Sequence, residues 1–319
     1  MSRKERRAVI DIGTNSVKLL VAEVSGHEIR PLCEDSKQTR LGEGFYTTHR
    51  LQRESVARTA TAVAQFARTA REWKATSLRV IATSAARDAK NPETLLRAVK
   101  RAAGLKVEII SGKQEASWAF QGVTSDPRLS EVPLLLLDVG GGSTEFILGH
   151  GACQHFRHSF PLGTVRLLEK FPPSDPPEKS ELTAVRKWLR SFLKKRVKPK
   201  FDLELRREAK LDPKHGVVQF IGTGGTASIL AKMQAKLNGF DRDRLEKARL
   251  TRTAVRAHAK KTWRLPLSKR QRIIGLPPNR ADVILMGIVI YEAVMEEFGF
   301  AELRVSTRGL RFAAVMEKI

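Results

Sequence analysis

The chain has 319 residues, about twice the usual length of one domain, so two domains with separate cores are expected. Charged residues make up 29% and hydrophobic residues 41% of the sequence, the composition of a soluble globular protein rather than a disordered one. With 58 Lys and Arg against 34 Asp and Glu, the formal net charge is +24. A surplus of this size favours polyanionic partners such as nucleic acid, polyphosphate or anionic lipid.

The cysteines and the N-terminus bear on the cellular compartment. Only Cys33 and Cys153 are present, which argues against a disulfide framework and for a reducing environment. Neither has an obvious base beside it, so both are interpreted as packing residues rather than catalytic thiols. The basic N-terminus has too short an apolar stretch for a signal peptide, and no apolar run approaches the roughly 18 residues of a membrane span. We therefore expect a cytoplasmic protein without a membrane segment.

The first part of the chain alternates between strand and helix patterns. Residues 8–24 read as two strands joined by the turn of "DIGTNS", which predicts a hairpin. The elements predicted after it are a helix at 51–73, a strand at 77–83, a helix at 93–103 and a strand at 107–110. Such alternation is typical of an α/β domain.

A polar segment, "ATSAARDAKN" at 82–91, follows the predicted strand at 77–83. It has two interpretations. It is either a simple strand-to-helix turn with Arg87 in solvent, or a turn that places Thr83, Ser84 and Arg87 on a phosphate group.

A second polar segment, "SGKQEAS" at 111–117, follows the predicted strand at 107–110 and puts Glu115 in the first turn of a helix. Ser111 and Gln114 have the spacing of a capping box, and an acid at Glu115 complements the helix dipole. Local pattern alone therefore favours a structural role for Glu115.

The hairpin pattern returns in the second half of the chain. Four leucines at 134–137 precede "DVGGGSTEF" at 138–146, and the strand-like "EFILG" follows. Asp138, Gly140 and Ser143 stand in register with the Asp, Gly and Ser of "DIGTNS". The chain therefore looks duplicated. We place the domain boundary near residue 126, which gives a first lobe at 1–126 and a second at 127–319.

The second half also carries a third glycine cluster and most of the positive charge. In "IGTGGTASIL" at 221–230, strand, glycine turn and helix N-terminus follow one another, an arrangement typical of anion binding. Most of the surplus of Lys and Arg lies between Arg186 and Arg272. A solvated helix face explains much of it. Because aromatic residues are only 6% of the chain and are not interleaved with these charges, nucleic-acid binding is not expected.

Glycine turns matter chemically because backbone amides can converge on phosphate oxygens only where no side chain intervenes. One such turn is commonly structural, whereas two in register and a third elsewhere favour phosphate binding. The candidate phosphate-binding residues are Gly13, Thr14, Asn15, Ser16, Thr83, Ser84, Gly140, Gly141, Gly142, Ser143, Gly222, Thr223, Gly224 and Gly225.

Three acidic residues are candidates for metal binding. An Asp at a strand end can hold a divalent ion or its waters against phosphate, which applies to Asp11 and Asp138. Both residues could equally cap their glycine turns. Glu145 could join them, or it could be the exposed member of an alternating strand.

Seven motifs, in this order, resemble those of the exopolyphosphatase/guanosine pentaphosphatase family of the actin/Hsp70/sugar-kinase superfamily. They are "DIGTNSVKLL", "ATSAARDAKN", "SGKQEA", "DVGGGSTEF", "PLGTVRLLE" (161–169), "GTGGT" (222–226) and "RADVI" (280–284). The resemblance spans nearly the whole chain. It implies an α/β, duplicated ribonuclease-H-like (actin-like ATPase) fold, whose two lobes each present a glycine hairpin to a phosphate chain in the active-site cleft between them.

The resemblance also implies roles for individual residues. In this family the glutamate of the "SG-x-x-E-A" motif activates the attacking water, and here it is Glu115. Arg87 would neutralise the terminal phosphoryl group. By the same resemblance, Asp138 and Glu145 would organise Mg²⁺ or another divalent ion. Asp11 remains a metal-binding candidate from its position at a strand end, and K⁺ is a further candidate cofactor. Glycine hairpins would donate to the phosphates.

Three features depart from the family pattern. Longer members continue as a helical extension where this sequence stops, so the resemblance does not extend to processive action on long chains. Lys113 and Gln114 stand where many relatives are acidic, and Phe312 replaces a glutamate that is common in relatives.

The leading functional hypothesis is a Mg²⁺-dependent exopolyphosphatase that acts as a homodimer, and the close alternative is hydrolysis of guanosine pentaphosphate (pppGpp). The basic surplus favours the polymer, because a nucleotide satisfies only a few cations. A non-catalytic polyanion-binding or ppGpp-binding module is less favoured, since Glu115 and both Asp residues are retained. A related sugar or acetate kinase would have no need of Glu115.

Overall fold

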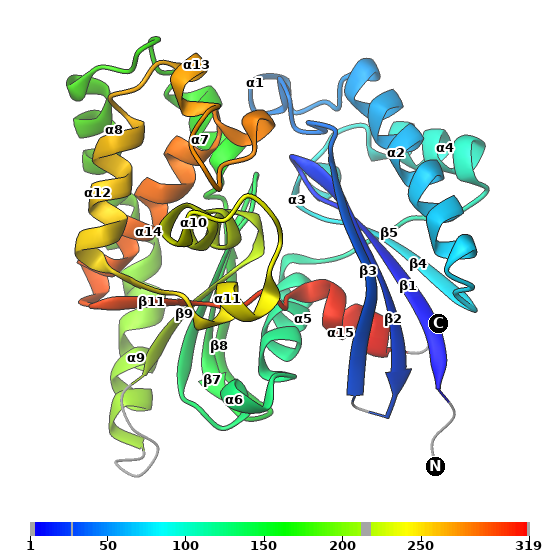
Figure 1. Ribbon diagram of the computed structural model, residues 1–319. Helices are drawn as coiled ribbons and strands as arrows, with labels where there is room; N and C mark the ends of the chain where they lie inside the picture. Colours follow the sequence, from blue (N-terminus) through cyan, green and yellow to red (C-terminus); the bar gives the residue numbers. More distant parts are fainter. Residues whose placement is uncertain (1–3, 27, 212–217, 318–319) are drawn as a thin grey trace. The chain divides into compact units, whose positions relative to one another are not determined.

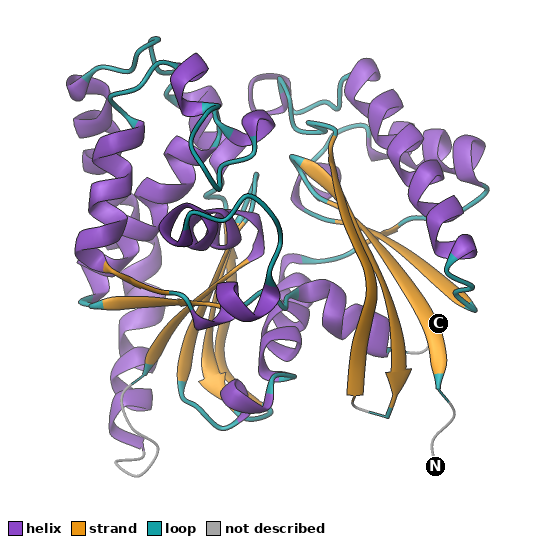
Figure 2. Ribbon diagram, in the orientation of Figure 1, coloured by secondary structure: helices purple, strands orange, loops and turns teal. Residues whose placement is uncertain are grey.

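Two mixed β-sheets, each with its own helices, form the structure, a computed structural model that describes residues 4–26, 28–211 and 218–317 (Figures 1 and 2). Contacts divide the chain into one unit of Met1–Asp126 with Arg308–Ile319 and a second of Pro127–Thr307. The basic stretch discussed above includes 212–217, which lie outside the described residues. Among the described helices, none has both the length and the apolarity to cross a membrane.

The first unit contains a five-stranded sheet in the order β3-β2-β1-β4-β5. The strands are β1 (Glu5–Ile12), β2 (Ser16–Ser25), β3 (Glu28–Gln38), β4 (Ser77–Ala82) and β5 (Glu108–Ile109). The helices are α1 (Phe45–Thr48), α2 (Arg53–Glu72), α3 (Ser84–Arg87), α4 (Pro92–Ala103), α5 (Gly112–Thr124) and α15 (Leu310–Met316). Strands β1, β4 and β5 are parallel, so their carboxyl ends lie at one edge of the sheet.

Hydrophobic patterning and end signals account for these elements. In α2, Val56, Val63 and Phe66 recur at helical spacing and are buried in the core of this unit. Helix α4 starts at Pro92, whose fixed φ suits a first helical position, and ends before Gly104 at φ +72°. The hairpin, the helices near 51–73 and 93–103 and both strands predicted here are confirmed.

The second unit contains a six-stranded sheet in the order β10-β11-β9-β6-β7-β8. The strands are β6 (Leu134–Val139), β7 (Thr144–His150), β8 (Cys153–Phe160), β9 (Gln219–Thr223), β10 (Arg249–Thr251) and β11 (Glu302–Val305). The longer helices are α7 (Thr164–Lys170), α8 (Lys179–Phe192), α9 (Lys198–Leu211), α10 (Gly224–Ala235), α12 (Arg252–Thr262) and α14 (Ile284–Phe298). Shorter ones are α6 (Pro127–Ser130), α11 (Arg242–Lys247), α13 (Leu267–Arg270), a π-helical turn at Leu193–Val197 and a 3₁₀ turn at Pro278–Arg280.

The two sheets repeat one topology. Strands β3-β2-β1-β4-β5 of the first unit match β8-β7-β6-β9-β11 of the second, with an antiparallel three-stranded meander followed by parallel strands in both. The duplication predicted from two short motifs therefore extends through five strands. The α/β fold class is confirmed.

The end of the chain belongs to the first unit, although the sequence prediction grouped it with the second lobe. Helix α15 packs against α5 and against strands β1 and β2. Phe312 is buried there, and the Arg308 guanidinium lies over its ring at 5.5 Å. Phe312 is thus a core residue of this unit, and packing accounts for an apolar side chain at this position.

Candidate active site

Both glycine hairpins close with the same hydrogen bond. In the first unit Gly13 N donates to Ser16 O at 3.0 Å, and in the second Gly140 N donates to Ser143 O at 3.0 Å. A Cβ on Gly13 or Gly140 would stand 3.2 or 3.0 Å from that carbonyl oxygen, closer than side chains normally approach. The in-register glycines therefore make equivalent tight turns at the ends of β1 and β6.

In the second unit, the first residues of α7 hydrogen-bond to the carbonyl groups of the turn. The amides of Thr164 and Val165 donate to the carbonyls of Gly140 and Gly141, at 3.0 and 2.8 Å. In a trans peptide the N–H points opposite to the preceding C=O. The amides of Gly141 and Gly142 are thereby directed away from α7, as an anion-binding turn requires.

The first hairpin is held in the same manner by the segment after β3. Gly42 N donates to Thr14 O at 2.8 Å, and Thr39 N and Arg40 N donate to Asn15 O at 3.1 and 3.0 Å. A Cβ on Gly42 would overlap the Thr14 side chain, so this close approach requires glycine. The amides of Asn15 and Ser16 then point away from the supporting segment.

Asp138 and Glu145 face each other across β6 and β7, directly opposite in the strand register. Glu145 is only 1% exposed and accepts a hydrogen bond from Ser159 Oγ at 2.7 Å, so the alternative of an exposed strand residue is wrong. The Asp138 carboxylate lies against the start of α10, where a Cβ on Gly224 would overlap its Oδ1.

This pair of carboxylates fits a divalent ion of the Mg²⁺ type, which is commonly bound by one or two carboxylates together with waters and substrate phosphates. A complete protein cage is not needed for such a site. Within the described part of the chain no group of three or more His, Cys, Asp or Glu is arranged to hold a metal by itself.

Asp11, the counterpart of Asp138, is 4% exposed at the end of β1. Burial raises the pKa of its carboxyl, while Lys18 and Arg311 lower it. Its Oδ1 has no hydrogen-bond partner among the described residues. Buried carboxylate oxygens are normally satisfied, so an orphaned one is compatible with a bound cation or ordered water.

The third glycine cluster divides into two parts. Gly222 lies within β9, where a Cβ would stand 2.9 Å from Tyr291 Oη and 3.0 Å from Leu303 Cδ1, so packing accounts for this glycine. Thr223, Gly224 and Gly225 form the N-terminus of α10, whose first amides lack intrahelical partners. This terminus is adjacent to Asp138, because β9 is the parallel neighbour of β6.

Glu115 and Arg87 are brought together in the first unit. Arg87 Nη1 donates to Glu115 Oε2 at 2.8 Å and to Ile110 O at 3.2 Å. Glu115 is 6% exposed in the first turn of α5, and Ser111 Oγ caps that helix by accepting from Gln114 N. The capping interpretation of the local sequence is therefore correct for Ser111, but it does not account for a buried, arginine-bound carboxylate.

Thr83 and Ser84 are buried at the carboxyl end of β4, level with the end of β1 through the bond from Thr83 N to Ile12 O at 3.1 Å. Ser84 Oγ has no hydrogen-bond partner in the described structure. The interpretation of residues 82–91 as a simple strand-to-helix turn is therefore wrong, because Thr83 and Ser84 are buried. Carboxyl ends of parallel strands are where ligands bind in α/β proteins, and both hydroxyls lie there with Arg87.

The predicted site residues therefore gather into one group in each unit. The first contains Asp11, the hairpin 13–16, Thr83, Ser84, Arg87 and Glu115, and the second contains Asp138, the hairpin 140–143, Glu145 and residues 223–225. Sequence reasoning missed the supports behind the hairpins, Thr39–Gly42 and Thr164–Val165. The motif "PLGTVRLLE" was the available signal for the second support.

A duplicated sheet of this order, with a glycine hairpin in each half, defines a two-lobed protein of the actin-like ATPase fold. Residues 20–318 match the model of the Ppx/GppA phosphatase family, and the chain belongs to that family. It is therefore an enzyme, a phosphatase of the Ppx/GppA type.

Relatives and solved structures agree with this assignment. Exopolyphosphatase 2 of Mycobacterium tuberculosis is 30% identical over 315 residues, which cover 94% of either chain. A Ppx/GppA family member from Aquifex aeolicus is 30% identical with a TM-score of 0.77, over 98% of this chain and 97% of that one. An exopolyphosphatase from Cytophaga hutchinsonii is 25% identical with a TM-score of 0.83, over 97% and 96%.

Proposed function

We propose that this chain hydrolyses the terminal phosphoanhydride bond of inorganic polyphosphate. The observation that carries the proposal is the buried Glu115 carboxylate, which accepts a hydrogen bond at 2.8 Å from Arg87, a residue of the short helix that follows Thr83. A fixed carboxylate at the edge of an anion-binding site is suited to activating a water. Support also comes from the relatives in Mycobacterium tuberculosis and Cytophaga hutchinsonii that are named exopolyphosphatases.

In the proposed reaction, a water attacks the terminal phosphorus in line with the bridging oxygen. Glu115 accepts the proton of this water at Oε1, while Arg87 holds Oε2. The new O–P bond forms as the bridging O–P bond breaks, and its electron pair stays on the shortened chain as a phosphate oxygen. Because a guanidinium has five N–H donors, Arg87 can bind Glu115 and Ile110 through Nη1 and still take part in neutralising the phosphoryl group.

The remaining predicted residues bind the phosphate chain and the metal. Both glycine hairpins donate backbone amides to phosphate oxygens, and the N-terminus of α10 adds donors next to Asp138. Asp138 and Glu145 would hold a Mg²⁺ ion, and Asp11 would be the acidic residue that the first unit adds. The ion, when bound, neutralises charge on the phosphate oxygens. The alternative substrate, pppGpp, presents the same terminal anhydride to the same residues.

The test compares Glu115→Gln with the wild-type enzyme. Phosphate release from medium-chain polyphosphate and from pppGpp is assayed side by side, and turnover of the variant should fall by about 10²–10⁴, the usual contribution of a general base. Glu54→Gln, an exposed carboxylate in the first turn of α2, serves as the control and should keep wild-type turnover. A Glu115→Gln enzyme with an unchanged melting temperature and more than half the activity would contradict the assignment. Faster turnover of pppGpp would identify the nucleotide as the substrate.

A further inference from the structure

Helix α8, the π-helical turn and α9 form a continuous helical run with an unusual concentration of positive charge. Every charged residue from Arg186 to Lys200 is Lys or Arg. We call residues 186–200 the cationic segment. Like charges four residues apart, such as Arg190 and Lys194, destabilise an isolated helix. The segment therefore carries an electrostatic cost that a bound polyanion would remove.

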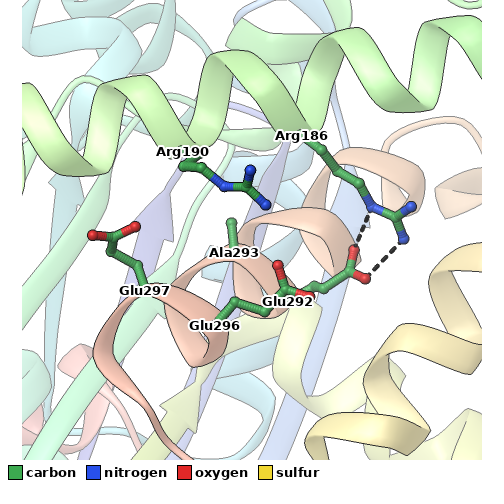
Figure 3. Close-up of a pocket in the computed structure, with 6 residues that line it drawn as sticks. All are labelled: Arg186, Arg190, Glu292, Ala293, Glu296 and Glu297. Carbon is green, nitrogen blue, oxygen red and sulfur yellow. Dashed lines mark hydrogen bonds and ion pairs between the residues drawn. The ribbon is translucent and has the colours of Figure 1, made fainter.

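Two ion pairs hold this segment on α14. Arg186 makes a bidentate contact with Glu292, with Nε to Oε2 at 3.0 Å and Nη2 to Oε1 at 2.7 Å (Figure 3). Lys198 Nζ lies 3.3 Å from Glu297 Oε1. Between them is a cavity of about 130 Å³, which Arg190 lines together with Ala293 and Glu296. The ion pairs of Arg186 and Lys198 thus attach both ends of the segment to α14 and determine which of its sides faces the protein.

Four cations of the segment have no such partners. Lys187, Lys194, Lys195 and Arg196 are exposed and make no ion pair with any carboxylate of the described residues. The π-helical turn presents Lys194, Lys195 and Arg196 consecutively, between the buried Leu193 and Val197. Such turns occur frequently at functional sites.

We propose that the cationic segment binds the part of a polyphosphate chain that extends beyond the phosphates held at the active site. This inference rests on the function proposed above. Polyphosphate carries about one charge per phosphate along a flexible chain, so it can follow a row of exposed cations. Nucleic acid fits less well. The nearby rings of Trp188 and Phe192 stack on each other at 5.1 Å and pack against the core, so they offer no platform for bases.

The test uses the triple variant Lys194→Gln, Lys195→Gln, Arg196→Gln. Its matched control is Arg53→Gln, Arg68→Gln, Arg71→Gln, which removes three exposed charges from α2. KM is measured for long-chain polyphosphate and for tripolyphosphate over a salt range of roughly 50 to 200 mM. The segment variant should raise the long-chain KM by at least about tenfold and lower the slope of log KM against log salt by about 2, since each phosphate contact contributes about 0.7. Its KM for tripolyphosphate should stay within about twofold of wild type.

The outcomes separate this inference from the proposed function. If neither phosphate substrate is hydrolysed by the wild-type enzyme, the proposed function fails. If both are hydrolysed, but the segment and control variants shift the long-chain KM equally, the inference alone is overturned. It is also overturned if a single-stranded oligonucleotide with the same number of phosphates binds the wild-type enzyme more tightly than polyphosphate and loses that affinity in the segment variant.

Discussion

Each glycine turn of the site depends on residues outside the turn that hold its carbonyl groups. In the second unit, Gly163 allows α7 to come so close that its amides reach the carbonyls of Gly140 and Gly141. The orientation of the loop amides is thus set by packing against α7. A substitution at Gly163 should affect the phosphate binding proposed for this loop without adding any group to the proposed binding surface.

Gly163→Ala tests this dependence. The new Cβ would stand 2.5 Å from Gly142 N, so the loop must shift. We expect KM for polyphosphate to rise about tenfold or more, because small displacements of binding groups have large effects on catalysis. Gly239→Ala is the matched control in the same unit, since a Cβ there meets nothing within 4 Å. An unchanged KM in a folded Gly163→Ala enzyme would refute the phosphate-binding role of the second hairpin.

At the level of elements, the attachment of α8 to α14 relies on a buried ion pair. Burial raises the pKa of the Glu292 carboxyl, Arg186 lowers it, and Glu296 raises it further. The net direction is upward, so the ionised form of Glu292 is less favourable in the folded protein than in the unfolded chain. The cost of removing both charges from water offsets much of the attraction in such a pair, so it adds little stability.

The pH dependence of Glu292→Gln follows from this direction. A raised folded-state pKa gives stability that is present below the ordinary value of 4.5 and is lost as the pH rises through the folded value. The free energy of unfolding of the Gln variant, relative to wild type, should therefore increase as the pH rises above the ordinary value of 4.5. Urea titrations at intermediate pH values measure it, with Glu296→Gln as a control for loss of one charge on α14. A relative stability that falls over this range would show that Arg186 outweighs burial.

On the scale of the whole molecule, the first unit is completed by the last helix of the chain. Arg7 Nη1 donates to Met316 O at 2.7 Å, and Trp118 Nε1 donates to Glu317 Oε1 at 2.7 Å. Together with the buried Phe312, these contacts join β1, α5 and α15 into one core. Loss of α15 packing should therefore weaken the unit that carries Glu115 and Arg87, and leave the second unit's core intact.

Phe312→Ala tests this division. Truncation of a buried phenylalanine typically costs about 3–5 kcal/mol. Hydrogen exchange should accelerate in peptides from β1, β2 and α5, whereas peptides from β6 and β7 keep wild-type protection. Phe146→Ala, in the core of the second unit, should give the reverse pattern. Equal acceleration in both units after either substitution would mean that the chain unfolds as a single cooperative structure.

Much of the fold and of the site was determined by the sequence itself. Short apolar runs followed by an in-register Asp, Gly and Ser predicted both hairpins, because turns and strand pairing depend on neighbours a few residues away. The structure places Asp11 and Asp138 at equivalent strand ends, as that register requires. The motif order was specific enough to indicate the family.

Only the tertiary structure decided which residues meet. Arg87 contacts Glu115 across 28 residues of sequence. The sequence alone suits Glu115 to a helix N-terminus, whereas this contact shows that its carboxylate is buried and held in one orientation. Glu145 is buried and accepts a hydrogen bond from Ser159 of β8. The side chain of Tyr291 leaves no room for a Cβ at Gly222, and Phe312 packs in the core of the first unit. Each of these depends on elements that are distant in the chain and adjacent only after folding. The periodicity of the sequence predicts whether a side chain faces the core or the solvent. Which residue it then contacts is determined by how the helices and strands of the whole unit pack.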